Sequence, residues 1–218
     1  MVHLHGWLAM TYDICTRGRN LIEIDFTKTP LEIGPFAAYD FFGDGSLYLL
    51  DTPGHAVGHI SGLVRTTTNP DTFIFLGGDL VHHGAELRPS RAVPIPADVQ
   101  NQYPCPSDIA QPCPGAAEFR ALTAAVGRDP NEPALEPAVF TNLSQAHESI
   151  VRAQIADADQ DIFVIWAHDM DINGTVDLFP LLANDWKKKG WREKVVWKFL
   201  ADLAAGAVKT SRVSVCSH

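Results

Sequence analysis

Several protein classes are excluded by what this sequence lacks. Only four of its 218 residues are cysteines, and none of their spacings is that of a zinc knuckle, so a disulfide-held scaffold is not expected. No apolar run reaches the roughly 18 to 20 residues that span a bilayer. The first residues, Met1–Trp7, lack the basic stretch and long apolar core of a secretory signal. We therefore expect a soluble, cytoplasmic protein with no membrane partner.

Positive charge is also scarce. The 17 Lys and Arg residues stand against 26 Asp and Glu residues, which leaves a net charge of −9. A nucleic-acid partner is not expected, because neutralising phosphates requires clustered basic side chains. The sequence also lacks a Gly-x-Ser-x-Gly elbow and a glycine-rich phosphate loop after a strand. These absences disfavour a serine hydrolase and a nucleotide-binding protein.

What the chain does have is the composition of a globular protein, with 46% hydrophobic residues and a length that suits one domain. Hydrophobic periodicity predicts mostly strands in the first half and mostly helices in the second, which indicates a layered α/β or α+β fold. The expected strands are residues 21–26, 36–42, 46–51, 60–66, 72–76 and 162–166. The expected helices are residues 116–126, 144–158 (capped by Ser144), 176–184 (broken by Pro180) and 191–205, and a long proline-rich loop is expected over 84–114.

Three residues of metal-ligand type follow predicted strands. His55 comes after a Pro-Gly turn, Asp79 follows a Gly-Gly pair, and His168 closes the last strand. A divalent metal site needs histidine or carboxylate ligands that converge from rigid elements, and three strand ends could deliver them to one edge of a sheet. Taken singly, a turn histidine is more often a surface residue, and an aspartate after Gly-Gly is more often a turn former. Together the three residues favour a metal site.

The order of these motifs resembles that of the metallo-β-lactamase superfamily, and most closely its lactonase-like and glyoxalase-II-like hydrolases. Residues 52–59 read Thr-Pro-Gly-His-Ala-Val-Gly-His, and Gly-Asp and Ala-His pairs end at Asp79 and His168. The resemblance implies an αββα sandwich with zinc, one or two ions, at one edge of the sheets. It implies that His55 binds the first ion, that Asp79 is the bridging and catalytic carboxylate, and that His168 binds the second ion.

The resemblance also implies an activity. It is hydrolysis of a small-molecule substrate, with a metal-bound hydroxide attacking the carbonyl of a lactone, thioester or similar group. One departure argues against it. The superfamily's main ligand string, His-x-His-x-Asp-His, is missing, and the only His-x-His is His3-Leu4-His5. Whether the chain is an enzyme therefore stays open. The alternative is a truncated or degenerate member of the superfamily without catalytic activity.

The same departure bears on the fold. Fewer than 60 residues precede His55, so we expect an irregular segment over residues 1–18 and, over residues 19–210, the C-terminal portion of the fold with an incomplete N-terminal sheet. An incomplete sheet would leave an apolar face uncovered, and we expect self-association through it.

Other polar residues beside the three candidate ligands have supporting roles in this interpretation. His59 is expected to orient the loop or a ligand, while His82 and His83 could border a substrate pocket or lie on the surface. Asp51 and Asp169 could hold ligand histidines by hydrogen bonds, although simple turn roles are equally compatible with their positions.

Overall fold

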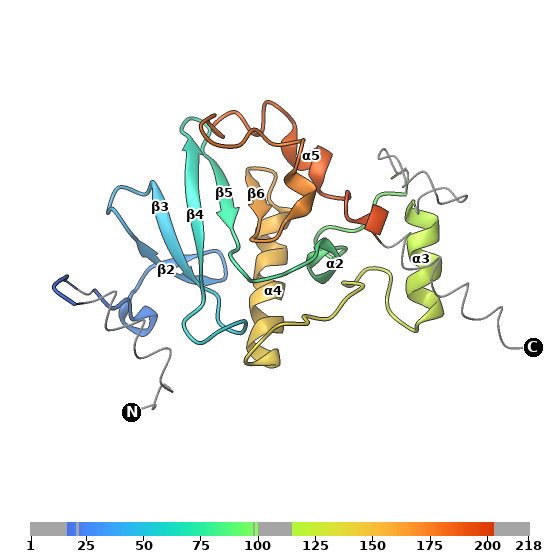
Figure 1. The fold of residues 1–218 in the computed structure, drawn as a ribbon, viewed down its shortest axis with the longest axis horizontal. Helices are drawn as coiled ribbons and strands as arrows, with labels where there is room; N and C mark the ends of the chain where they lie inside the picture. Colours follow the sequence, from blue (N-terminus) through green and yellow to red (C-terminus); the bar gives the residue numbers. More distant parts are fainter. Residues whose placement is uncertain (1–16, 21, 98, 100–114, 203–218) are drawn as a thin grey trace, which may run out of the picture.

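Six strands form a single mixed sheet within residues 17–20, 22–97, 99 and 115–202, the part of the chain that the computed structural model describes. The strands are β1 (Glu32–Ile33), β2 (Phe36–Asp40), β3 (Leu47–Asp51), β4 (Ile60–Thr67), β5 (Thr72–Leu76) and β6 (Ile162–Ile165). They lie side by side in chain order (Figure 1). Neighbours are antiparallel except β5 and β6, which are parallel because a long crossover, residues 77–161, joins them.

The helices are short apart from two. They are η1 (Phe26–Lys28), α2 (Gly84–Leu87), α3 (Ala116–Ala125), α4 (Leu143–Ala158), η2 (Met170–Ile172) and α5 (Trp191–Val195). α3 stands at the end of the molecule remote from β2 and β3 (Figure 1). None of the described helices is long and apolar enough to cross a membrane.

The two faces of the sheet are covered by different elements. Successive side chains of a strand point to opposite faces. Phe75 and Val164 therefore face one way and pack with Ile150 and Ala153 of α4 in the main core. Their neighbours on the strands face the other way and pack with residues from the segment that leads into α5 and from α5 itself. This second cluster consists of Ile74, Phe163, Trp186, Trp191 and Val195.

The α/β architecture is confirmed, and so are most of the predicted elements. The hairpin expected over residues 36–51 is present as β2 and β3, and the predicted strands at 60–66, 72–76 and 162–166 are β4, β5 and β6. The described residues contain one sheet, so the second sheet of a complete αββα sandwich is not among them. Of the predicted irregular segment, only residues 17 and 18 are described. Self-association stays a prediction.

Several expected boundaries and elements are wrong. Residues 22–25 form no strand, because the Asp25 side chain accepts the Thr27 N–H and starts the η1 turn instead. Residues 176–184 form turns rather than a helix, and Pro180 in their middle has no N–H to donate. The cap of α4 is Asn142, whose side chain accepts the Gln145 N–H, and not Ser144.

Two further predictions hold only in part. The loop expected over 84–114 starts with the short helix α2, and residues 100–114 lie outside the described part. Of the helix expected over 191–205, residues 203–205 lie outside the described part. The described residues are α-helical at Trp191–Val195, form turns at 196–199 and are helical again at 200–202.

Candidate metal centre

The ends of four strands meet at one edge of the sheet. β3 ends and β4 begins around the loop of residues 52–59, and β5 and β6, which run antiparallel to β4, end beside it. Beyond the strands, the Gly77 N–H donates to the Ile165 carbonyl over 2.8 Å and the Ala167 N–H donates to the Gly78 carbonyl over 2.8 Å. These two bonds extend the pairing past the strand ends and carry Asp79 and His168 to the same place.

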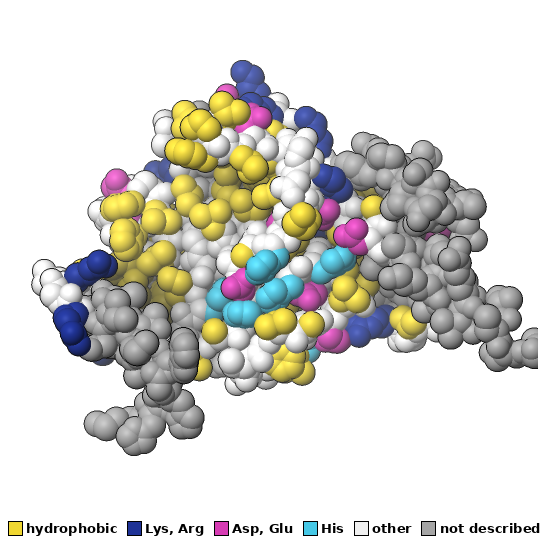
Figure 2. Space-filling model, viewed as in Figure 1, with side chains coloured by type: hydrophobic (Ala, Val, Ile, Leu, Met, Phe, Trp, Pro, Cys, Tyr) yellow, Lys and Arg dark blue, Asp and Glu magenta, His cyan; other side chains and the backbone are white. Residues whose placement is uncertain are grey.

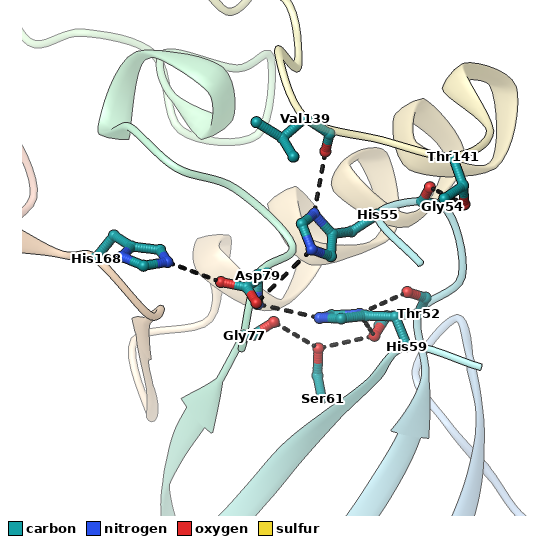
Figure 3. Close-up of polar contacts among 10 residues, drawn as sticks. All are labelled: Thr52, Gly54, His55, His59, Ser61, Gly77, Asp79, Val139, Thr141 and His168. Atoms are coloured by element: carbon teal, nitrogen blue, oxygen red, sulfur yellow. Dashed lines mark hydrogen bonds and ion pairs between the residues drawn. The ribbon is translucent and has the colours of Figure 1, made fainter. Parts of the chain in front are cut away.

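The carboxylate of Asp79 lies between the two histidines that the sequence motifs single out with it. Its Oδ1 is 3.2 Å from Nε2 of His168, and its Oδ2 is 3.7 Å from Nε2 of His55 (Figure 3). Oδ1 is buried and has no hydrogen-bond partner among the described residues, since its contact with His168 lacks hydrogen-bond geometry. A buried carboxylate oxygen without a partner is costly, and a bound cation would relieve that cost.

His55 is held by the loop that precedes α4. Its Nδ1 lies 3.1 Å from the carbonyl oxygen of Val139, which can only accept, so Nδ1 carries the proton and Nε2 is left to face Asp79 (Figure 3). A metal-binding histidine is typically oriented by such a bond from its other nitrogen. The carbonyl of Gly54 accepts the N–H groups of Thr141 and Asn142, which fixes this loop against the start of the helix.

Both ring nitrogens of His59 form hydrogen bonds with neighbouring groups. Nδ1 donates to the Thr52 carbonyl over 2.8 Å, so the unprotonated Nε2 accepts the Asp79 N–H over 3.0 Å. The hydroxyls of Thr52 and Ser61 lie 2.9 Å apart, and Ser61 donates to the Gly77 carbonyl (Figure 3). His59 is therefore not free to bind a metal ion in this arrangement. It positions the Asp79 backbone instead.

His168 has an unusual backbone conformation. Its φ is +65°, in the left-handed region that residues with a side chain rarely adopt. Such residues cost of order 1 kcal/mol or more and are found disproportionately at functional sites. The conformation turns the chain away from the end of β6 and presents the exposed imidazole to Asp79.

His82 joins the cluster, although sequence reasoning gave it only a pocket or surface role. Its ring centre is 5.1 Å from that of His55 and 5.7 Å from that of His168. Asp79, His82 and His168 each offer a ligand atom, and all of these atoms lie within 4.8 Å of one another. Figure 2 shows the histidines gathered on one face of the molecule beside acidic side chains. The sequence signal for His82 was the Asp-x-x-His spacing after β5. Because a loop has no regular period, this spacing does not predict where the His82 side chain points.

Three other candidates have different surroundings. His83 accepts the Ala85 N–H at the start of α2, and its Nε2 lies 3.5 Å from Asp202. Burial raises the pKa of Asp51 above its ordinary value, which Arg152 of α4 partly opposes. Asp169 accepts the backbone N–H two residues ahead of it, and burial raises its pKa as well. Among the described residues, the structure shows neither carboxylate in a hydrogen bond with a histidine.

The donor set of the cluster fits a divalent metal ion. It combines imidazole nitrogens with one carboxylate whose buried oxygen lacks a hydrogen bond, and these are the ligands that zinc and similar ions take in proteins. The surrounding bonds from Val139 and His59 hold two of the residues in place before any ion binds.

Comparison with known proteins finds relatives that are named as hydrolases. It is 46% identical to "Gamma-lactamase FDB1" of Fusarium pseudograminearum over 192 residues, which are 85% of this chain and 45% of that protein. It is 38% identical to "Metallo-hydrolase mfmC" of Annulohypoxylon moriforme over 209 residues, which are 90% of this chain and 52% of that protein. The chain spans about half the length of these two relatives.

A third relative is much longer. The chain is 40% identical to "Cytochrome P450 monooxygenase mpaDE'" of Penicillium brevicompactum over 198 residues, which are 89% of this chain and 21% of that protein. No family model and no solved structure matches the chain.

Proposed function

Because this chain belongs to the metallo-β-lactamase superfamily, as its gamma-lactamase and metallo-hydrolase relatives show, we propose that it carries part of a zinc-dependent hydrolase that opens a cyclic carbonyl compound. The observation that carries the proposal is the Asp79 carboxylate, whose two oxygens face His168 and His55 at the common edge of β4, β5 and β6. No monooxygenase chemistry is proposed, since the match to the P450 relative covers only 21% of that protein.

The ion would be held at the Asp79 carboxylate, whose two oxygens face histidines. A divalent ion bound there would polarise a substrate carbonyl and make a water molecule more acidic. The chain's own contribution is to fix these side chains in advance. His59 holds the backbone of Asp79, and the Val139 carbonyl fixes which nitrogen of His55 faces the carboxylate.

The substrate class we propose is a γ-lactam, with a lactone or a thioester as the related alternatives. Each has an acyl carbon to which hydrolysis adds the oxygen of water, while the leaving nitrogen, oxygen or sulfur takes a proton. Val57 and Met170, which follow His55 and His168 by two positions in the chain, are 97% and 72% exposed, and we propose that they offer apolar contact for the carbon skeleton of such a ring.

A second function has its own supporting observation. The sequence lacks the His-x-His-x-Asp-His string, and the described residues bring together donors enough for one ion rather than two. A non-catalytic member of the superfamily that binds a single ion accounts for this as well.

Metal content and turnover together separate the two functions. We expect the purified chain, supplied with zinc and then freed of excess by gel filtration, to retain close to one equivalent by mass spectrometry. It is then incubated with a γ-lactam, a γ-lactone and an acyl thioester, and product is detected as the gain of one water. We expect Asp79→Asn to lower kcat/KM for the substrate turned over by about 100-fold or more.

His147→Gln is the matched control, because this histidine lies on the exposed side of α4, where it pairs with Glu136. It is expected to leave turnover unchanged. Turnover that persists after chelation and in Asp79→Asn contradicts a metal-dependent hydrolase. Stoichiometric zinc without turnover of any of the three compounds supports the non-catalytic alternative.

A further inference from the structure

We propose that His82 is itself a metal ligand in this chain, and that a single ion is held by Asp79, His82 and His168. The inference rests on the proposed function for the presence of an ion and goes beyond it in assigning the ligands. The sequence predicts a pocket or surface role, and not that of a ligand, for His82, which follows Asp79 by three positions in an irregular loop.

The first support is proximity. The ligand atoms of Asp79, His82 and His168 all lie within 4.8 Å of one another, so one ion can be within bonding distance of all three after small side-chain rotations. The rings of His82 and His168 are nearly parallel, at 18°, with centres 5.7 Å apart. His55 lies on the other oxygen of the carboxylate, with Nε2 3.7 Å from Oδ2, and is not a member of this group of three.

The second support is that both ring nitrogens of His82 are free. Neither has a hydrogen bond to any residue in the described part of the chain. Other histidines of the region are engaged: His59 through both nitrogens, His55 through Nδ1 to Val139, and His83 through Nδ1 at the start of α2. A half-buried imidazole without a protein partner is the one that can still accept a metal ion.

The third support is the rigid mounting of the loop that carries His82. Its backbone N–H donates to Oε2 of Glu86 over 2.9 Å, and Glu86 is only 4% exposed. Leu80 and Val81, the two residues before it, are buried in the main core. The loop is therefore held by its own core side chains and by α2, so little conformational entropy remains to be lost when His82 binds an ion.

His82 completes a set of three donors. Asp79 supplies a carboxylate oxygen, and His82 and His168 each supply an imidazole nitrogen. Two histidines and one carboxylate bind a divalent ion and leave coordination positions open. His55 then faces the carboxylate from the side opposite His168 as a positioning residue.

Zinc titration of the full chain, labelled with nitrogen-15, tests the assignment. Long-range proton–nitrogen spectra report each imidazole nitrogen separately, so the wild-type chain alone identifies the ligands. We expect ring signals of His82 and His168 to shift stoichiometrically with zinc, and those of His83 and His147 to stay in place. Zinc affinity is then measured by calorimetry for three variants, His82→Ala, His55→Ala and His83→Asn. Asparagine keeps an N-cap at the start of α2.

We expect His82→Ala to weaken zinc binding by more than about 100-fold, beyond the 10- to 100-fold loss that removal of an outer partner causes. His55→Ala should weaken it less, and His83→Asn should leave it unchanged. The inference is overturned if zinc shifts the ring signals of His55 and not those of His82, or if His82→Ala binds zinc as tightly as His83→Asn. In that case the wild type still binds zinc and the proposed function stands. A wild-type chain that binds no zinc overturns both.

Discussion

The backbone N–H of Asp79 donates to Nε2 of His59 over 3.0 Å, although the two residues are 20 positions apart in the chain. Nδ1 of the same ring donates to the carbonyl of Thr52, at the start of the loop after β3. One imidazole thus joins the end of β5 to the loop that carries His55. The direction of the Asp79 carboxylate depends on this link.

Removing the link should therefore weaken metal binding without removing a ligand. We predict that His59→Ala lowers zinc affinity by about 10- to 100-fold, the loss typical of an outer-shell partner, measured by calorimetry. His147→Ala, on the exposed side of α4, is the control and should have no effect. The outcome that would contradict this role is a zinc affinity of His59→Ala equal to that of the control.

The tight packing of the His55 loop against α4 can be tested at Gly54. Its φ is +134°, and a Cβ added there would lie 2.3 Å from the backbone nitrogen of Ala146. Because neither backbone can move freely, we predict that Gly54→Ala lowers the free energy of unfolding by about 3 kcal/mol or more, measured in urea.

Gly58 offers a matched comparison within the same loop. Its φ is +75°, but a Cβ there would meet nothing within 4 Å. Gly58→Ala should therefore cost only the left-handed strain of about 1 to 2 kcal/mol. Equal losses in the two variants would show that backbone strain, and not contact with α4, determines the cost at Gly54.

A buried ion pair ties α4 to the residue that follows α2. Nε and one terminal nitrogen of Arg88 donate to the two oxygens of Asp157 over 2.7 and 2.6 Å, and both side chains are 1% exposed. We predict that Arg88→Met lowers the free energy of unfolding by about 3 to 5 kcal/mol, since it leaves a buried carboxylate without its partner.

The double variant Arg88→Met/Asp157→Leu should recover most of that loss, because a well-packed apolar pair has no charge left to desolvate. Unfolding in urea measures all three proteins. A double variant that is less stable than Arg88→Met alone would instead assign the loss to packing against Trp166, over which the guanidinium lies.

Stability should depend on pH through Asp171. Burial and the nearby charges of Asp169 and Asp202 raise the pKa of Asp171 from 3.8 to about 6. Between these two pH values the folded protein holds a proton that the unfolded chain has released. The contribution of Asp171 to the free energy of unfolding is therefore largest below pH 4 and is lost as the pH rises through 6. An uncharged replacement removes that dependence.

We therefore predict that Asp171→Asn raises the thermal midpoint at pH 8 and changes it little at pH 4, with the difference developing between pH 4 and pH 6. Scanning calorimetry at a series of pH values measures it. A gain of equal size at pH 4 and pH 8 would show that the side chain's shape, and not its charge, is responsible.

Local patterns in the sequence predicted the sheet well where apolar residues alternate or form buried runs. The hairpin of residues 36–51 has both alternation and a glycine turn, and it is present as expected. The strand predicted at residues 21–26 is absent from its described part, residues 22–26, because the Asp25 side chain accepts a hydrogen bond from Thr27, and this local contact competes with pairing to another strand. The helix predicted at 176–184 is absent. Hydrophobic periodicity in this segment does not compensate for the hydrogen bond that Pro180 cannot donate or for the clash of its ring with the preceding turn.

The candidate site divides in the same way. Glycine-flanked ligands after strands indicated His55, Asp79 and His168, and the structure brings these three together. His82 was not selected as a metal ligand. The direction of a side chain in a loop depends on contacts such as the hydrogen bond from the His82 N–H to Glu86, and hydrophobic periodicity does not predict such contacts. The supporting roles considered for Asp51 and Asp169 depended equally on distant partners.

By itself, the sequence indicated the superfamily, the position of most strands along the chain and the residues that follow them, because these depend on local periodicity and on motifs within short segments. Tertiary structure alone decided which side chains around Asp79 can share an ion. That depends on long-range contacts, from Val139 to His55 and from His59 to Asp79, that set the direction of each side chain. Such directions are fixed by packing and hydrogen bonding between segments far apart in the chain, and no local pattern specifies them.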